Sequence, residues 1–110
     1  MYSGVYKIKC IVDDKIYIGS SMNIEKRWDT HIKSLRANKH RNPHLQNSFN
    51  KYGEKSFIFG IIEYCNLDDI LIREQFYLDL YRPYDRYRGF NNCKKTYRLQ
   101  AHCRVKSKNV

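Results

Sequence analysis

The pattern of hydrophobic and polar positions opens with two short β runs. Residues 4–12 and 15–19 are rich in β-branched and aromatic side chains, which is typical of strands. Asp13 and Asp14 between them form a turn signal. We therefore expect an antiparallel hairpin at the start of the chain.

The register of this hairpin decides which side chains share a face. A two-residue turn would place Cys10 opposite Tyr17. Tyr6, Ile8, Cys10 and Tyr17 would then lie on one face of the sheet. A turn that differed by one residue would put the tyrosines on opposite faces.

A first helix is predicted from Asn23, which is a favourable N-cap with Glu25 in the first turn. Arg27 and His31 lie one turn apart along the edge of its apolar stripe. Taken singly, Arg27 reads as a solvated charge and His31 as a packed imidazole. The stripe itself consists of Ile24, Trp28, Ile32 and Leu35.

A short second helix and a third strand follow. Asn42 and Pro43 form an N-cap followed by proline at the first helical position, and Gly53 is a stop signal. Residues 56–64 predict a mostly buried strand. The inward side chains of the short helix are Leu45, Phe49 and Tyr52.

The third helix carries one charge where a hydrophobic residue is expected. We predict that Asn66 caps it, with Asp68 and Asp69 in the first turn, and that Pro83 ends it. Glu74 falls on the centre line of the apolar stripe, where an ionised carboxylate is costly unless a cation meets it. Glu74 is therefore either half of a structural ion pair or a metal-binding or acid-base group. The stripe is Leu67, Ile70, Leu71, Leu78 and Tyr81.

The order strand, strand, helix, helix, strand, helix predicts an α+β fold. We expect a small antiparallel three-stranded sheet flanked by helices. Residues 1–93 would form one domain, and residues 94–110 a basic C-terminal tail.

Charge points to an anionic partner. The chain has 21 Lys and Arg against 11 Asp and Glu, a net charge of +10, and 15% aromatic residues. This composition, without a long apolar run or a leader-like start, excludes a membrane protein, a secreted scaffold and a multidomain enzyme. Basic residues are dense at 26–41 and at 94–110. Both stretches are expected to contact phosphates, although the second also reads as a solvated end.

The cysteines indicate a reducing, intracellular compartment. Cys10, Cys65, Cys93 and Cys103 contain no C-x-x-C pair and are expected to be free thiols. A metal site built from Cys93, His102 and Cys103 is the weaker alternative.

Two tripeptides carry a family resemblance. Residues 4–6 read Gly-Val-Tyr and residues 17–19 read Tyr-Ile-Gly. They resemble the two half-motifs of the GIY-YIG nuclease family, with Val5 in place of the usual Ile. The stretch HLQNSFNKYGEKSF, residues 44–57, is similar to the phage and intron homing-endonuclease branch.

The resemblance continues to residue 92 and implies further site residues. The run E-K-R-W-x-x-H places Arg27 and His31 in the family's helical positions, and R-E-Q-F-Y-L supplies Glu74 as its metal-binding glutamate. The family's terminal asparagine matches Asn91, with Asn92 as a second candidate.

The resemblance implies a DNA endonuclease that uses Mg²⁺, or Mn²⁺, to hydrolyse phosphodiester bonds. Tyr6 would act as general base or proton relay, Tyr17 would orient water or phosphate, and these two roles could be exchanged. Arg27 would grip the phosphate, His31 would support Tyr6 or join the relay, and Asn91 would brace the site. The DNA-binding candidates are Lys15, Lys26, Lys33, Arg36, Lys94 and Lys95.

Other interpretations remain open at this level. A catalytically silent nucleic-acid-binding module would keep the fold and the charge, and a structure-specific repair-type nuclease would keep the chemistry. A structural RNA-binding protein would explain the charge but not Glu74. With one predicted site per chain, double-strand cutting would need a transient dimer, sequential binding or repositioning of a monomer.

Overall fold

The computed structural model of the chain describes residues 2–85 and 87–91. Its order of strands and helices is the predicted one, with short 3-10 turns at Glu54–Ser56 and Leu67–Asp69. The main elements are β1 Gly4–Cys10, β2 Ile16–Ser21, α1 Ile24–Arg36, α2 Pro43–Tyr52, β3 Phe57–Tyr64 and α3 Ile70–Tyr81. The α+β class and the three-stranded antiparallel sheet are confirmed, and the strand order is β2-β1-β3.

The β1–β2 hairpin has a longer turn than predicted. Tyr17 pairs with Ile8 rather than with Cys10, so the predicted register was wrong. The loop runs over residues 11–14, and Asp14 takes a left-handed conformation with φ 61° that a short polar side chain tolerates. The observed register differs from the predicted one by an even number of positions, so the same side chains still share a face. Tyr6, Ile8 and Cys10 still belong to one cluster, and Tyr17 packs against it.

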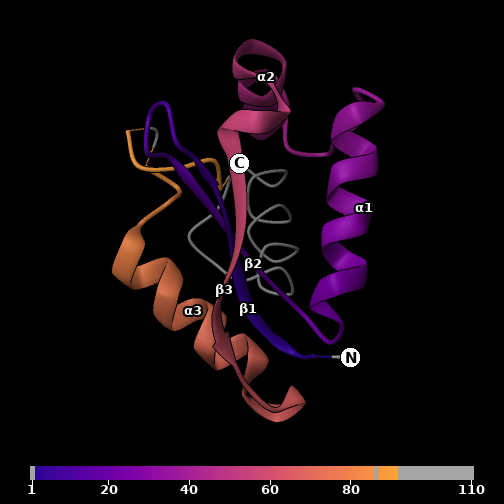
Figure 1. Cartoon of the computed structure of the whole chain (residues 1–110). Helices are drawn as coiled ribbons and strands as arrows, with labels where there is room; N and C mark the ends of the chain where they lie inside the picture. Colours follow the sequence, from indigo (N-terminus) through magenta and orange to yellow (C-terminus); the bar gives the residue numbers. More distant parts are fainter. Residues whose placement is uncertain (1, 86, 92–110) are drawn as a thin grey trace, which may run out of the picture.

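Helices cover both faces of the sheet. Figure 1 shows α1 and α3 on opposite sides of the strands, with α2 at one end. One core contains Ile24 and Leu35 of α1 together with Leu45 and Phe49 of α2. A smaller core on the other face joins Val5 and Ile18 to Leu78 of α3.

The third strand is more exposed than predicted. β3 lies at the edge of the sheet, and Phe57 is its one buried residue. Ile58 and Tyr64 are more than half exposed. The apolar run of residues 57–64 therefore does not reflect burial on both faces.

Local capping signals place α1 and α2 as predicted. The Asn23 side chain accepts a hydrogen bond from the Lys26 amide, and the Asn42 side chain accepts one from the Leu45 amide. Gly53 ends α2 with φ 86°, a value that favours glycine.

The predicted start of α3 was wrong. Asn66 makes no side-chain capping bond, and a 3-10 turn precedes the helix, which begins at Ile70. Leu67 is 59% exposed and Tyr81 is also exposed, so both ends of the predicted inward stripe lie outside the core. Ile70 and Leu78 are buried, as predicted.

The structure tests two further expectations, on free cysteines and on membrane-spanning helices, over the residues that it describes. Cys10 and Cys65 are free thiols, whereas Cys93, His102, Cys103 and the tail 94–110 lie outside the described residues. Among the helices of the described ranges, none has the length and apolar character to cross a bilayer.

Candidate active site

A glycine on β2 makes room for a tyrosine on β1. Tyr6 and Gly19 are cross-strand partners, and the Tyr6 side chain is 1% exposed. A Cβ atom added to Gly19 would lie 2.5 Å from the Tyr6 hydroxyl oxygen. The glycine of the Tyr-Ile-Gly tripeptide thus lets the Tyr6 ring lie across the neighbouring strand.

Tyr6 and His31 form a buried pair. The Tyr6 hydroxyl and His31 Nε2 are 2.7 Å apart, and His31 is 5% exposed. The ring of Tyr17 stands edge-on to His31, with centroids 5.5 Å apart. The two predicted tyrosines therefore meet one imidazole.

A second histidine lies behind His31. Nε2 of His40 is 2.7 Å from Nδ1 of His31, and the two rings stack with an interplanar angle of 17°. The Asn42 amide donates to His40 Nδ1 at 3.0 Å. His40 lies within the basic stretch 26–41, and the sequence pattern assigned it no role of its own. It precedes α2 in a loop, so no helical or strand spacing relates it to His31.

Burial keeps both members of the Tyr6–His31 pair uncharged. Burial raises the pKa of Tyr6 well above its usual range, and the nearby Tyr17 and Glu74 act in the same direction. Charge and hydrogen bonding from Arg27 act against this rise in the Tyr6 pKa. Burial, with smaller effects of His40 and Arg27, lowers the pKa of His31 to about 3. Both groups are neutral at pH 7.

Glu74 approaches the same strand from the opposite face. It is 3% exposed on α3, and the Ser20 hydroxyl donates a hydrogen bond to its Oε1 atom. Ser20 follows Gly19, and adjacent residues of a strand point to opposite faces. The site therefore straddles β2, which like β3 is an outer strand of the sheet. Ser20 is a further polar group that sequence reasoning did not assign.

Asn91 pairs with the outer edge of β2. Its Oδ1 atom accepts from the Ile18 amide at 2.8 Å, and its Nδ2 atom donates to the Ile18 carbonyl at 2.9 Å. The Phe90 amide donates to the Ile16 carbonyl, so this short segment runs along the strand as a neighbour would. Asn91 thereby satisfies backbone groups that an edge strand leaves open.

The donor set for a metal is sparse. Within residues 2–85 and 87–91, no group of three or more His, Cys, Asp and Glu side chains is placed to hold a metal ion. A buried carboxylate beside a hydroxyl, as in Glu74 and Ser20, nevertheless fits Mg²⁺, which keeps several waters and takes further oxygen ligands from phosphate.

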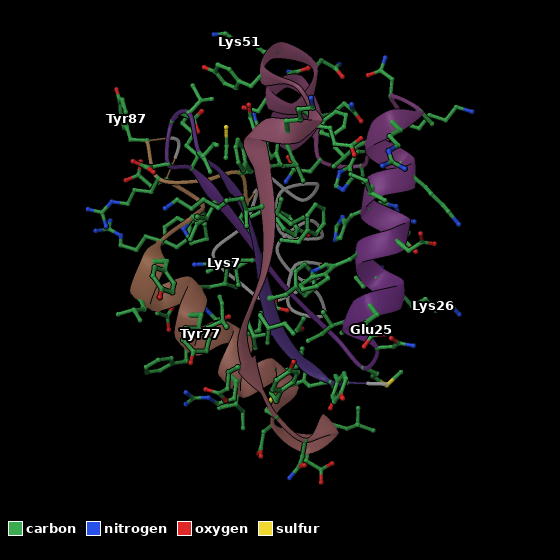
Figure 2. The ribbon with its side chains drawn as sticks, in the orientation of Figure 1. Lys7, Glu25, Lys26, Lys51, Tyr77 and Tyr87 are labelled. Atoms are coloured by element: carbon green, nitrogen blue, oxygen red, sulfur yellow. The ribbon has the colours of Figure 1, made fainter. Side chains whose placement is uncertain are left out.

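The predicted DNA-binding residues differ in whether they form ion pairs with carboxylates. Lys33 forms an ion pair with Asp29 at 2.8 Å, and Arg36 pairs with Glu54 at 2.7 Å. Figure 2 places Lys26 at the N-terminal end of α1, on the side away from the sheet. Lys94 and Lys95 lie outside the described residues.

Fold and site together define a small catalytic-type domain whose polar side chains gather around one edge strand. The family model described as the GIY-YIG catalytic domain matches residues 2–91, and the chain belongs to this family.

The curated relatives are intron endonucleases by name. Intron-associated endonuclease 1 of Enterobacteria phage T4 is 41% identical over 80 residues, which are 71% of this chain and 32% of that protein. Probable intron-encoded endonuclease 1 of Neurospora crassa is 34% identical over 89 residues, 81% of this chain and 28% of that one. The chain thus spans about a third of the length of these relatives.

Solved structures agree in fold over nearly the whole described chain. The catalytic domain of the intron endonuclease I-TevI, in a point-mutant form, matches with a TM-score of 0.78 and 35% identity, covering 88% of this chain and 99% of that one. A second structure of the catalytic domain of this homing endonuclease matches with a TM-score of 0.74 and 35% identity, and the match covers 83% of this chain and 98% of that one. The recognition of the homing-endonuclease branch is confirmed.

Proposed function

We propose that this chain is a metal-dependent DNA endonuclease that hydrolyses phosphodiester bonds. One observation carries the proposal. The Tyr6 hydroxyl meets His31 at hydrogen-bond distance and lies within the electrostatic influence of Tyr17, Arg27 and Glu74. Side chains from three elements and both faces of the sheet thus act on one reactive group. The names of the relatives support DNA as the substrate.

Arg27 is the phosphate-binding residue of this proposal. Its guanidinium presents a planar fork of donors that matches phosphate oxygens. Negative charge on these oxygens grows in the transition state, so the same contacts become stronger there. Arg27 stands on the exposed side of α1, where it can reach both a phosphate and the Tyr6 hydroxyl.

Tyr6 is the proton acceptor. Tyr6 first loses its own proton to solvent, which gives the reactive phenolate. The phenolate oxygen then takes a proton from the attacking water as the water oxygen bonds to phosphorus. The bond from phosphorus to the 3′ oxygen breaks, and the 3′ oxygen takes a proton from solvent water. Burial opposes this phenolate, and Arg27 favours it. Tyr17, beside the same imidazole, orients water or phosphate.

Glu74, with Ser20 beside it, is the proposed ligand for a divalent cation such as Mg²⁺ or Mn²⁺. When bound, the cation would supply Lewis-acid charge to the phosphate and the leaving oxygen. Asn91 fixes the edge of β2 between Tyr17 and Gly19, and so holds the backbone on which Tyr17 and Ser20 stand.

The basic tail 94–110, the exposed Lys26 and the half-buried Lys15 are proposed to contact the DNA backbone. Among the described residues, neither Lys15 nor Lys26 takes part in an ion pair. Lys33 and Arg36 already neutralise carboxylates, so we assign them a smaller share.

Conversion of supercoiled plasmid to nicked or linear DNA tests the proposal. We expect cleavage by the wild type with Mg²⁺, none with EDTA, and a loss on the order of 10²–10³ for Glu74→Gln. Glu54→Gln is the matched control, since it removes an exposed carboxylate that pairs with Arg36, and should cleave like the wild type.

Cleavage by Glu74→Gln at the wild-type rate would contradict the assignment of the metal ligand. DNA binding without cleavage of plasmid, branched or mismatched DNA by folded protein would instead establish a catalytically silent binding module.

A further inference from the structure

A chain of hydrogen bonds leads from a backbone amide to the proposed base. The Asn42 amide donates to His40 Nδ1 at 3.0 Å, His40 Nε2 lies 2.7 Å from His31 Nδ1, and His31 Nε2 lies 2.7 Å from the Tyr6 hydroxyl. The first proton in this chain has a fixed position, because a backbone N–H can only donate.

That fixed donor determines every later proton. His40 Nδ1 accepts from Asn42, so a neutral His40 carries its proton on Nε2. This proton points at His31 Nδ1, which must accept it, and His31 therefore carries its own proton on Nε2. His31 in turn donates to the Tyr6 hydroxyl oxygen.

We propose that His40 is a positioning residue that, held by the Asn42 amide, locks His31 in the Nε2–H tautomer so that His31 donates a hydrogen bond to Tyr6. The inference rests on the proposed function for its catalytic meaning, while the tautomer itself is a property of the folded chain.

The assignment decides between two roles of His31. Because Nε2 already carries a proton, His31 cannot take the proton of Tyr6 and does not relay it towards His40. It stabilises the phenolate instead, since a hydrogen bond to a charged acceptor is about twice as strong as one to a neutral acceptor. These linked hydrogen bonds therefore offset part of the free-energy cost that burial imposes on the Tyr6 phenolate.

The surroundings keep both imidazoles neutral, as the tautomer chain requires. Tyr6 from β1, Tyr17 from β2 and Arg27 from α1 face His31 together with His40. Burial is the main cause that lowers the pKa of His31 and also that of His40, with Arg27 acting in the same direction. A doubly protonated ring would point two N–H groups at each other.

Gln46 and Asn42 hold the loop that carries His40. The His40 amide donates to Gln46 Oε1, and the Gln46 amide nitrogen donates to the Leu35 carbonyl at the end of α1. Asn42 Nδ2 donates to the Phe90 carbonyl, next to Asn91. Buried polar contacts therefore fix His40 to both α1 and the β2 edge.

Long-range ¹H–¹⁵N correlation of the imidazoles in the ¹⁵N-labelled full chain at pH 7 reads the tautomers directly. The sequence has 4 histidines, which single His→Gln variants assign. We expect Nε2–H and unprotonated Nδ1 in both His31 and His40. An Nδ1–H tautomer or an imidazolium at His31 in the wild type would overturn the proposal.

Two variants at position 40 test the link to activity. His40→Gln keeps an N–H donor for His31, and we expect the Nε2–H tautomer and cleavage within about ten-fold of the wild type. His40→Glu can only accept, so we expect His31 to switch to Nδ1–H, cleavage to fall at least about a hundred-fold, and a new ionisation to enter the pH profile as the carboxylate stabilises imidazolium.

His44→Gln, in the first turn of α2, is the control and should alter neither tautomer nor cleavage. Equal loss of cleavage in both His40 variants with His31 still Nε2–H would show a merely structural role and overturn the proposal. If the wild type shows the expected tautomers but cleaves no DNA, the proposed function fails while the tautomer lock stands. If a variant does not fold, the wild-type spectrum still decides the tautomers.

Discussion

Two buried neutral histidines couple the stability of this domain to pH. In the folded state the pKa of His31 is about 3, and that of His40 is also lowered, whereas an unfolded histidine titrates near its ordinary value. The unfolded chain therefore binds more protons below about pH 6.5. We expect the free energy of unfolding to fall as pH drops from about 6.5 towards 5, by up to about 1.4 kcal/mol per pH unit from His31.

Urea unfolding at pH 5, 6 and 7 measures this slope. Arg36 and Arg73 lower the pKa values of Glu54 and Glu63. Such carboxylates therefore begin to protonate below this range of pH. His31→Gln should flatten the slope, whereas His44→Gln should leave it unchanged. Equal slopes in the wild type and His31→Gln would contradict the lowered pKa of His31.

At the residue scale, sequence reasoning found the groups that break a pattern. Glu74 interrupts an apolar stripe, and its burial is as the helical period predicts. His40 interrupts nothing, because it stands in a loop whose position depends on Gln46, Asn42 and Phe90. Its contact with His31 comes from tertiary packing, which no local spacing encodes.

The β1–β2 pair makes Gly19 indispensable to the position of Tyr6. In Gly19→Ala the new Cβ would meet the Tyr6 hydroxyl oxygen and ring at 2.5–2.6 Å. Tyr6 is packed against Trp28 and His31, so it has to leave its hydrogen bond or push the strands apart. We expect a loss of about 1–3 kcal/mol in stability and at least about a hundred-fold loss of plasmid cleavage.

Gly60→Ala is the matched control for this substitution. Gly60 also lies within a strand, but an added Cβ would meet the flexible Lys7 side chain at 3.4 Å. Thermal unfolding and plasmid cleavage of the two variants can be compared directly. Similar activities would show that the close approach of Gly19 to Tyr6 does not govern catalysis.

The outer edge of β2 depends on Asn91. Asn91→Ala removes both hydrogen bonds to Ile18 and leaves a buried amide and carbonyl without these partners. We expect a cost of about 2–4 kcal/mol in chemical unfolding. Asn66→Ala, at an exposed position with no side-chain capping bond, should cost less than about 0.5 kcal/mol. Equal costs would refute the bracing role.

At the element scale, strand and helix identity could be predicted but their contacts could not. Caps at Asn23 and Asn42 gave the helix starts because capping is local. The hairpin register failed because the loop spans residues 11–14 and is closed by a hydrogen bond from the Asp14 amide to the Cys10 carbonyl, a closure that the Asp13-Asp14 signal does not distinguish from a two-residue turn. The burial of β3 was misjudged because edge position follows from strand order, which the apolar content of one segment does not reveal.

For the whole molecule, a net charge of +10 predicts salt-sensitive DNA binding. If roughly six phosphates are neutralised, affinity should fall about a thousand-fold between about 50 and 200 mM salt. Within α1, Lys26→Gln should reduce the slope of log affinity against log salt by about 0.9. Lys33→Gln should change it less, since Lys33 already pairs with Asp29. Fluorescence anisotropy with a short duplex in EDTA measures both slopes.

Residues 94–110, the basic tail, carry more of the net positive charge than the rest of the chain. Residues 94–110 contain six Lys and Arg and no acidic residue, whereas Lys33 and Arg36 of α1 are held by carboxylates. Replacing these six tail residues by Gln should lower the salt slope by at least about 2.7, the equivalent of roughly three phosphates, while leaving the site residues in place. Cleavage at saturating DNA should then stay near the wild-type rate if, as proposed, the tail contributes affinity and residues 2–91 contribute the chemistry. An unchanged slope would assign DNA contact to the catalytic domain alone, and a loss of cleavage at saturation would place the tail in the active site.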